Sequence, residues 1–135
     1  MAVFMLGVVT SGLTASTLLK NIFQRPRPDL VPYAAGMSGS SFPSGHSMMS
    51  AVTFLALGAL LARSQERRSL KAFLLLTAVL LTFLVGVSRV YLGVHWPSDV
   101  VAGWTAGAVW ALLCWLAAHW LQARHTIESE TEHAS

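Results

Sequence analysis

The sequence predicts an all-α integral membrane protein, a helical bundle with about four transmembrane helices. Of its 135 residues, 54% are hydrophobic and only 11% are charged, whereas about 25% are charged in an ordinary soluble domain. Four stretches contain no Asp, Glu, Lys or Arg, and a membrane-spanning helix needs about 20 mostly apolar residues. These stretches are residues 1–19, 47–62, 72–88 and 100–122. The same composition excludes a disordered chain, which needs low hydrophobicity and high net charge.

The first three stretches differ in how well they fit a membrane helix. Residues 1–19 make a poor signal peptide, because no Lys or Arg precedes the apolar run and Lys20 follows it instead. Residues 47–62 are short for a span, so we expect His46 and the residues before it to extend this helix at its start. Residues 72–88 lead directly to Arg89, where we expect the third helix to end.

The fourth stretch contains two glycines at the spacing of a helix contact. Gly103 and Gly107 form a GxxxG pair, and small residues at this spacing let a neighbouring helix approach closely. We favour packing within this chain over a dimer contact. After Gln122 the sequence turns polar and acidic, so we expect a membrane domain of residues 1–122 and a frayed, polar C-terminal tail of residues 123–135.

Basic residues between the helices set the expected orientation in the membrane. Residues 63–71, between the second and third helices, carry four Lys or Arg side chains, and the positive-inside rule places such a loop in the cytoplasm. Residues 20–44 and 89–99 then form two loops on the opposite face. We expect a multi-pass protein of the cytoplasmic (inner) membrane with its active site in these two extracytoplasmic loops. The basic residues are dispersed, with a net charge of +3, so no nucleic-acid partner is expected.

The first extracytoplasmic loop begins with a group of cations. Lys20 and Arg27 supply positive charge at the end of a membrane helix, and an Arg side chain can bind two phosphate oxygens at once through its planar guanidinium. Arg25 lies between them, and we leave it outside the site because basic side chains at a helix end commonly extend toward lipid headgroups.

The end of this loop has the features of an anion-binding helix start. Ser44 suits an N-cap and Gly45 allows close approach to the backbone. The unpaired N–H groups of a first helical turn attract anions. His46 would lie beside such an anion with a proton that titrates near neutral pH.

The second extracytoplasmic loop pairs a histidine with a carboxylate. Pro97 suits the first position of a new helix, which places Asp99 in the first turn, within reach of His95. A carboxylate on one ring nitrogen fixes the tautomer and leaves the other nitrogen as a nucleophile or base. Arg89 contributes a further positive charge at the start of this loop.

Together these segments resemble the motifs of the type 2 phosphatidic acid phosphatase superfamily, membrane phosphatases related to haloperoxidases. The family pattern is K-x6-RP, then PSGH, then SR-x5-H-x3-D. The matching residues here are Lys20 with Arg27-Pro28, then Pro43-Ser44-Gly45-His46, then Ser88-Arg89 with His95 and Asp99. The resemblance covers residues 20–99 directly and nearly the whole chain through the helices that frame the motifs.

The resemblance implies a mechanism and a role for each matching residue. His95 would be the nucleophile that forms a phosphohistidine, Asp99 its orienting carboxylate and His46 the proton donor to the leaving oxygen. Five positions would hold the phosphoryl oxygens, namely Lys20, Arg27, Ser44, Gly45 and Arg89. The family needs no metal and no cofactor, and the sequence lacks the carboxylate cluster that a magnesium site prefers.

The chain departs from the family in the number of helices. Membrane members usually have six, two of them before the helix that carries the first motif, so we expect this chain to lack the two leading helices. It is then either a short form or fragment, or a partner supplies the missing cover, as a second copy in a homo-oligomer or as helper helices.

The expected activity is hydrolysis of a membrane lipid phosphate, because a site at the membrane surface admits a headgroup while the lipid chain stays in hydrocarbon. Undecaprenyl pyrophosphate or another polyprenyl pyrophosphate, phosphatidylglycerol phosphate and phosphatidate all fit. One alternative is a vanadate-dependent haloperoxidase, since vanadate mimics phosphate, although those relatives are soluble. Another is a truncated, non-catalytic subunit that binds anions, which the presence of both histidines and Asp99 disfavours.

Overall fold

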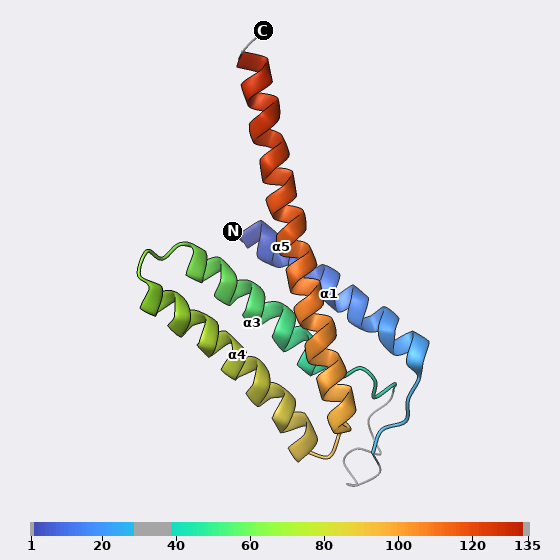
Figure 1. The fold of residues 1–135 in the computed structure, drawn as a ribbon. Helices are drawn as coiled ribbons and strands as arrows, with labels where there is room; N and C mark the ends of the chain where they lie inside the picture. The colour runs from blue at the N-terminus through green and yellow to red at the C-terminus, as the bar shows by residue number, and fades with distance from the viewer. Residues whose placement is uncertain (1, 29–38, 134–135) are drawn as a thin grey trace.

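The computed structural model describes residues 2–28 and 39–133, with side chains up to Gln122. The described chain is all-helical (Figure 1), and four of its helices are long and apolar enough to cross a membrane. Their bounds are α1 Ala2–Phe23, α3 Gly45–Arg63, α4 Arg68–Tyr91 and α5 Pro97–His133. The predicted fold class, an all-α membrane bundle, is confirmed.

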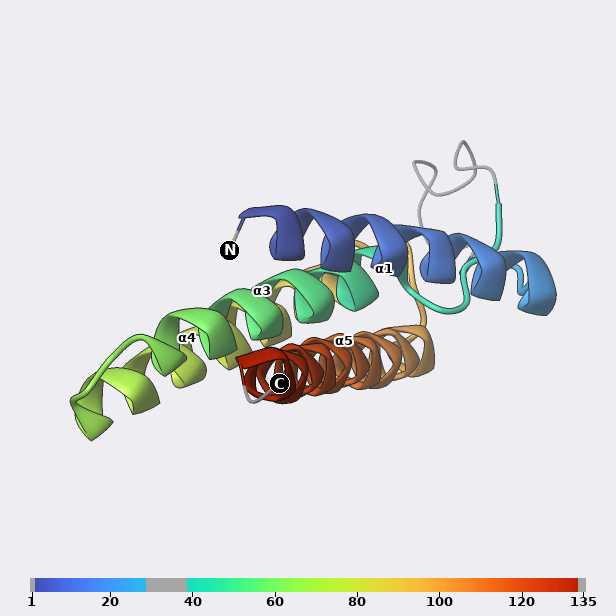
Figure 2. The ribbon, with the colours of Figure 1, turned by 90° about the horizontal axis from the view of Figure 1, so that it is seen from above.

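Helix α3 lies at the centre of the bundle. It packs against α4, α5 and α1, and the view from above shows it between α1 and α5 (Figure 2). In the most apolar part of α3 44% of the residues are buried, against 17% in each of the other three helices. The outer face of α4 exposes Phe73, Leu76 and Leu84, which suits a surface that faces lipid.

Two glycines of α5 allow it to lie directly against α3. A Cβ atom added at Gly103 would stand 2.7 Å from the carbonyl oxygen of Ser44, and one at Gly107 would overlap the carbonyl oxygen of Met48. Contacts this close require the absence of a side chain. The GxxxG pair therefore packs within the chain, as the sequence analysis favoured.

The turn between α4 and α5 is short and places the start of α5 beside the end of α4. Gly93 adopts a φ of 66°, a conformation that glycine takes without steric cost. The N–H of Gly93 donates to the carbonyl of Val90 at 2.9 Å, and the N–H of Asp99 donates to the carbonyl of Trp96 at 2.9 Å. Pro97 is the first residue of α5, as predicted from its sequence.

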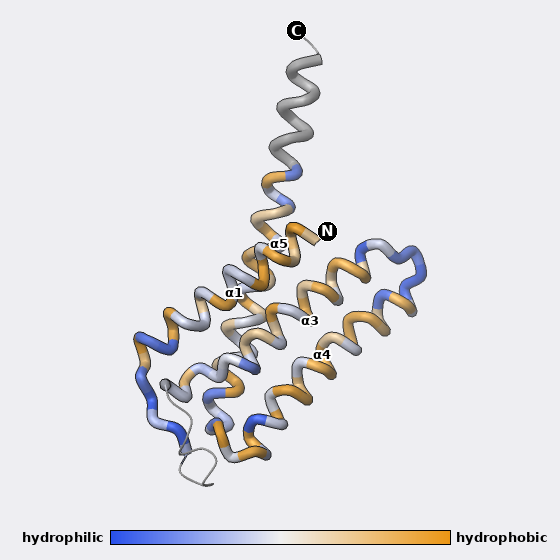
Figure 3. The backbone as a smooth tube through the Cα atoms, turned by 180° about the vertical axis from the view of Figure 1, so that it is seen from behind, coloured by the Kyte–Doolittle hydropathy of each residue, from blue (hydrophilic) through white to orange (hydrophobic). Residues whose placement is uncertain are grey.

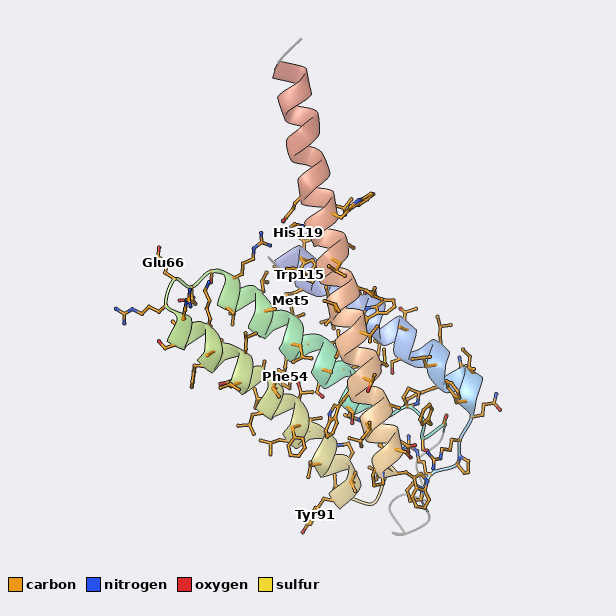
Figure 4. The ribbon with its side chains drawn as sticks, viewed as in Figure 1. Met5, Phe54, Glu66, Tyr91, Trp115 and His119 are labelled. Carbon is orange, nitrogen blue, oxygen red and sulfur yellow. The ribbon has the colours of Figure 1, made fainter. Side chains whose placement is uncertain are left out.

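The polar segments lie at the two ends of an apolar bundle. Figure 3 shows hydrophilic backbone in the α3–α4 loop and, at the other end, in the chain that follows α1. Side chains of the α3–α4 loop and of the opposite end are drawn in Figure 4, where Glu66 and Tyr91 mark the two ends. All motif residues lie at the end that carries Tyr91.

Helix α5 is longer than the sequence indicated. The backbone continues as one helix to His133, past the expected boundary at Gln122, whereas residues 123–135 were expected to be frayed. No Gly or Pro follows Gly107, so nothing in the local sequence breaks the helix there. The loss of apolar periodicity marks the end of the apolar surface, and it does not mark the end of the helix.

Candidate active site

Hydrogen bonds bring the three motif segments together at one end of the bundle. The N–H of Ser44 donates to the carbonyl of Asp99 at 2.9 Å, which ties the start of α3 to the first turn of α5. Arg27 Nη1 donates to the carbonyl of Val94 at 3.2 Å, and Ser41 Oγ donates to the carbonyl of Pro26 at 3.1 Å. The segments that the sequence analysis placed on one face are therefore in direct contact.

Ser44 caps helix α3, as its sequence position predicted. Its Oγ accepts a hydrogen bond from the N–H of Ser47 at 3.4 Å and another from Ser47 Oγ at 3.0 Å. Ser44 itself is fully buried. The side chain thus satisfies one of the free N–H groups of the first turn, and N–H groups of a helix start that stay free attract anions.

Gly45 allows Lys20 to lie across the start of α3. A Cβ atom at Gly45 would stand 3.3 Å from both Cε and Nζ of Lys20. The close approach predicted at Gly45 is therefore to a side chain of α1. It brings a positive charge to the N-terminus of α3, where the helix dipole is also positive.

Three cations of the site, Lys20, Arg27 and Arg89, have no carboxylate partner among the described side chains. Among the described side chains the acidic ones are Glu66 and Asp99, and Glu66 lies at the far end of the bundle (Figure 4). No described carboxylate lies within ion-pair distance of Lys20, Arg27 or Arg89. An uncompensated group of charges at a helix N-terminus attracts an anion.

Within this group the charges are close enough to interact. Lys20 is within electrostatic reach of Arg27, and His46 is within reach of both and of Arg89. Arg89 Nε also donates to Ser88 Oγ at 3.2 Å, and Arg27 Nε is buried with no hydrogen-bond partner in the described chain. Such a donor is expected to be satisfied by a bound ligand or by water.

His95 lies between a carboxylate and a guanidinium. Its side chain is 3% exposed and that of Asp99 is 0% exposed. The Nδ1 atom stands 3.5 Å from Asp99 Oδ2, and the Nε2 atom stands 3.5 Å from Arg27 Nη1. The predicted approach of Asp99 to His95 is confirmed, and Arg27 occupies the other side of the ring.

The surroundings of His95 keep its ring neutral. Burial, followed by the positive charge of Arg27, lowers the pKa of His95 to about 4, and Asp99 acts in the opposite direction. At neutral pH the ring therefore carries one proton and one lone pair. Both neighbours favour the same tautomer, because Asp99 can only accept from Nδ1–H and Arg27 can only donate to Nε2.

His46 has a more open position than His95. It is exposed and lines a cavity of about 300 Å³ together with Lys20 and Gly45. This cavity continues between α1 and α3 to the apolar side chains of Leu13 and Met49. A phosphate near Lys20 could therefore carry an apolar chain that follows the two helices into the membrane.

Arg25, which was left outside the predicted site, contacts Asp99. Its Nη1 donates to Asp99 Oδ1 at 2.8 Å and to Ser98 Oγ at 2.8 Å, and the guanidinium lies 5.7 Å from the centre of the Trp96 ring. Arg25 therefore belongs to the site and does not extend toward headgroups. The signal that could have found it is Asp99, because a buried carboxylate needs a compensating positive charge.

The described side chains contain no set of metal ligands. In residues 2–28 and 39–122, no three His, Cys, Asp or Glu side chains gather closely enough to hold a metal ion. The polar groups of the site are instead donors suited to an anion's oxygens.

The described residues form a membrane bundle that contains a cation-lined helix start and a carboxylate-paired histidine. Residues 1–123 match the family model of the PAP2 superfamily. The chain belongs to this superfamily.

Two curated relatives and one solved structure illustrate the match. Phosphatidylglycerophosphatase B of Bacillus subtilis is 40% identical over 91 residues, which is 67% of this chain and 44% of the relative. Lipid A 1-phosphatase of Rhizobium johnstonii is 36% identical over 115 residues, covering 78% of this chain and 43% of the relative. This chain thus spans less than half the length of either relative.

The solved structure is that of a transmembrane PAP2 type phosphatidylglycerolphosphate phosphatase from Bacillus subtilis. It superposes with a TM-score of 0.78 at 34% identity, over 87% of this chain and 58% of the other. The four-helix arrangement described above is therefore also the arrangement of a membrane phosphatase.

Proposed function

We propose that this protein hydrolyses a lipid phosphate at the membrane surface, with His95 as the nucleophile. The observation that carries the proposal is the setting of His95, a buried neutral ring with a carboxylate at Nδ1 and an arginine at Nε2. A nucleophile of this kind needs an unprotonated nitrogen that points toward a phosphate, and the Nδ1–H tautomer leaves that lone pair on Nε2.

In the proposed reaction Nε2 attacks phosphorus and the bond from phosphorus to the lipid oxygen breaks. His46, exposed in the same cavity as Lys20, gives its proton to the leaving oxygen. Water then attacks the phosphohistidine and gives a proton back to His46, the P–N bond breaks, and inorganic phosphate leaves while His95 regains its lone pair. Asp99 stabilises the positive charge that the ring carries in the intermediate.

The phosphoryl oxygens bind to Lys20, Arg27 and Arg89 and to the N–H groups at the start of α3. Phosphoryl transfer depends mainly on positioning and on stabilising the charge of the transferring group. The three cations supply this charge without a described carboxylate to compensate them. With this arrangement the reaction proceeds without a metal ion.

The substrate we propose is a lipid whose chain lies between α1 and α3. The cavity beside Lys20 and His46 extends to Leu13 and Met49, so one side of it is polar and the other apolar. Relatives are named for phosphatidylglycerophosphate and lipid A, and both substrates combine a phosphate with acyl chains. A polyprenyl pyrophosphate and phosphatidate meet the same requirement.

We further propose that the site faces outward from the cytoplasmic membrane. This orientation is supported by the positive charges of Arg63, Arg67, Arg68 and Lys71 at the other end of the bundle, which the positive-inside rule assigns to the cytoplasm.

The test is phosphate release by the purified chain from phosphatidylglycerophosphate, lipid A, undecaprenyl pyrophosphate and phosphatidate, each with and without EDTA. We expect turnover of at least one of these lipids, unchanged by EDTA and abolished in His95→Ala. His119→Ala, which alters an exposed histidine of α5, is the matched control and should keep full activity.

Other outcomes would point elsewhere. Vanadate binding without any phosphate release would favour a non-catalytic anion-binding subunit. Oxidation of bromide by peroxide in the presence of vanadate would favour a haloperoxidase. Activity that EDTA removes would contradict the proposed metal-independent reaction.

A further inference from the structure

Arg25 joins two segments of the site through a side chain that the family motifs do not include. The residue follows α1, and its Nη1 donates both to Asp99 Oδ1 and to Ser98 Oγ, each at 2.8 Å. The two acceptors lie in the first turn of α5. Asp99 is fully buried, while the Arg25 side chain is 39% exposed. Water therefore reaches the arginine of this pair, whereas the carboxylate is shielded from it.

The position of Arg25 is held by contacts beyond the ion pair. The N–H of Arg25 donates to Ser40 Oγ at 3.0 Å, and its carbonyl accepts from the N–H of Ser41 at 2.8 Å. The guanidinium also lies over the ring of Trp96. A surface ion pair is usually weak because two long side chains must be immobilised, and here the backbone and an aromatic ring already restrain the arginine.

The two oxygens of Asp99 have separate partners. Oδ1 accepts from Arg25, whereas Oδ2 accepts from the N–H of Trp96 at 3.0 Å and faces His95 Nδ1 at 3.5 Å. A carboxylate held at both oxygens cannot rotate freely, so the oxygen that faces the histidine stays in place.

From this arrangement we propose that Arg25 is a positioning residue of the hydrolytic reaction, which acts on His95 through Asp99. Arg25 binds one carboxylate oxygen, so that the other stays opposite Nδ1 of His95 at 3.5 Å, and Nε2 of the ring is directed toward the phosphate site. The inference rests on the proposed function, since positioning matters only if His95 is the nucleophile.

Arg25 also limits how strongly Asp99 attracts a proton to His95. The charged groups that face the ring are Asp99 from α5, Arg27 from the segment after α1 and Lys20 from α1. A guanidinium on the carboxylate offsets part of its negative charge. Without Arg25 the field of Asp99 at the ring is stronger, and the pKa of His95 rises. A larger share of the protein is then protonated at Nε2 and cannot attack.

This role differs from that of Arg27. Arg27 approaches His95 at Nε2, the side of the phosphate, whereas the side-chain hydrogen bonds of Arg25 go to the first turn of α5. Removal of Arg25 should therefore reduce kcat and leave phosphate binding intact. Removal of Arg27 should weaken binding as well.

The experiment compares Arg25→Gln and Arg25→Lys with Arg67→Gln, which changes an exposed arginine in the α3–α4 loop. Each full-length variant is purified in detergent. The measurements are kcat and KM against pH with phosphatidate in mixed micelles, inhibition by vanadate, and the pKa of His95 by ¹⁵N NMR without substrate. Comparison with His95→Gln identifies the signal of His95.

For Arg25→Gln we expect kcat to fall by up to about 10²-fold, with KM and vanadate inhibition within about twofold of wild type. The acid limb of kcat and the NMR pKa of His95 should both rise. Arg25→Lys retains the charge at Oδ1, so it should restore the acid limb and part of the rate. Arg67→Gln should match wild type.

An Arg25→Gln protein with wild-type kcat, or with an unchanged His95 pKa, would overturn the inference. So would a loss of kcat/KM that arises from KM alone, because this would make Arg25 a phosphate ligand. If Arg25→Gln does not fold, the Arg25→Lys variant tests the inference instead. A lower kcat at constant KM in this variant supports the inference, and a wild-type kcat overturns it. The NMR titration needs no turnover, so it tests Arg25 even if wild type proves inactive on every lipid.

Discussion

The two nitrogens of His95 face groups of opposite charge, and this difference determines which nitrogen carries the proton. Asp99 stands at Nδ1 and Arg27 at Nε2, each 3.5 Å away. The ring is also buried. Burial and Arg27 together outweigh Asp99 and lower the pKa of His95 to about 4. A ring that keeps one nitrogen unprotonated at neutral pH is suited to act as a nucleophile.

The lowered pKa of His95 predicts a loss of stability in acid. In the unfolded chain the imidazole takes up a proton near pH 6.5, whereas in the folded protein it resists protonation down to about pH 4. The unfolded state therefore binds more protons in this interval, and stability falls as the pH is lowered from 6.5 to 4. Above pH 6.5 the folded protein keeps the whole stabilising contribution of His95.

Thermal unfolding in detergent measures this effect. The melting temperature of wild type should drop more between pH 6.5 and pH 4 than that of His95→Gln, which has no titrating ring. His119→Gln, at an exposed position, should follow wild type. Equal drops in wild type and His95→Gln would show that His95 titrates at its ordinary pKa.

At the scale of elements, the contact between α3 and α5 sets the geometry of the site. Gly103 lies against the carbonyl of Ser44, and the N–H of Ser44 donates to the carbonyl of Asp99. The N-cap of α3 and the carboxylate of α5 are therefore fixed by one helix contact. A displacement of α5 along or away from α3 would move Asp99 relative to the anion-binding helix start.

Gly107→Ala tests this coupling. The added methyl group would overlap the carbonyl of Met48 and approach Ala51 Cβ, so α5 must shift away from α3. Overpacking of this kind costs about 1–3 kcal/mol, and we expect lower thermal stability together with reduced kcat. Gly7→Ala is the matched control in α1, because a Cβ there meets nothing within 4 Å. Wild-type activity in Gly107→Ala would show that the geometry of the site does not depend on the contact between α3 and α5.

Sequence patterns predicted the elements well because each depends on local chemistry. Charge-free stretches predicted the helices, Ser44 and Pro97 predicted two helix starts, and the spacing from His95 to Asp99 predicted their contact. Two features were not predicted: the place of Arg25, which depends on tertiary structure, and the end of α5, for which the sequence signal is ambiguous. Arg25 pairs with a residue 74 positions away, and no local pattern encodes that pairing. The continuation of α5 past Gln122 was missed because hydropathy reports burial in lipid and does not report helix formation.

At the scale of the whole molecule, the polar groups of the bundle are separated into two unlike ends. One end carries the cations and histidines of the site, and the other carries the α3–α4 loop; Figure 3 colours the chain after α1 and this loop as hydrophilic. The apolar helices between them match a span of hydrocarbon. This division suits the proposed substrate, whose phosphate would bind at one end of the protein and whose lipid chain would lie along the adjoining helices.

Orientation in the membrane is tested with Ser64→Cys, in the α3–α4 loop, on a Cys114→Ala background. We expect an impermeant thiol reagent to label this cysteine only after the membrane is opened, because the positive-inside rule places the loop in the cytoplasm. A cysteine at Asn21, near the site, should be labelled in intact cells and serves as the control. Labelling of Ser64→Cys in intact cells would mean that the site faces the cytoplasm.

A rapid quench with a ³²P-labelled substrate tests whether His95 carries the phosphoryl group during turnover. Wild type quenched in base should retain a label that is stable to base and released by acid, as expected for a phosphohistidine. His95→Ala should retain none, and His119→Ala should match wild type. Equal labelling of His95→Ala, or turnover by wild type with inversion of configuration at phosphorus, would contradict the account.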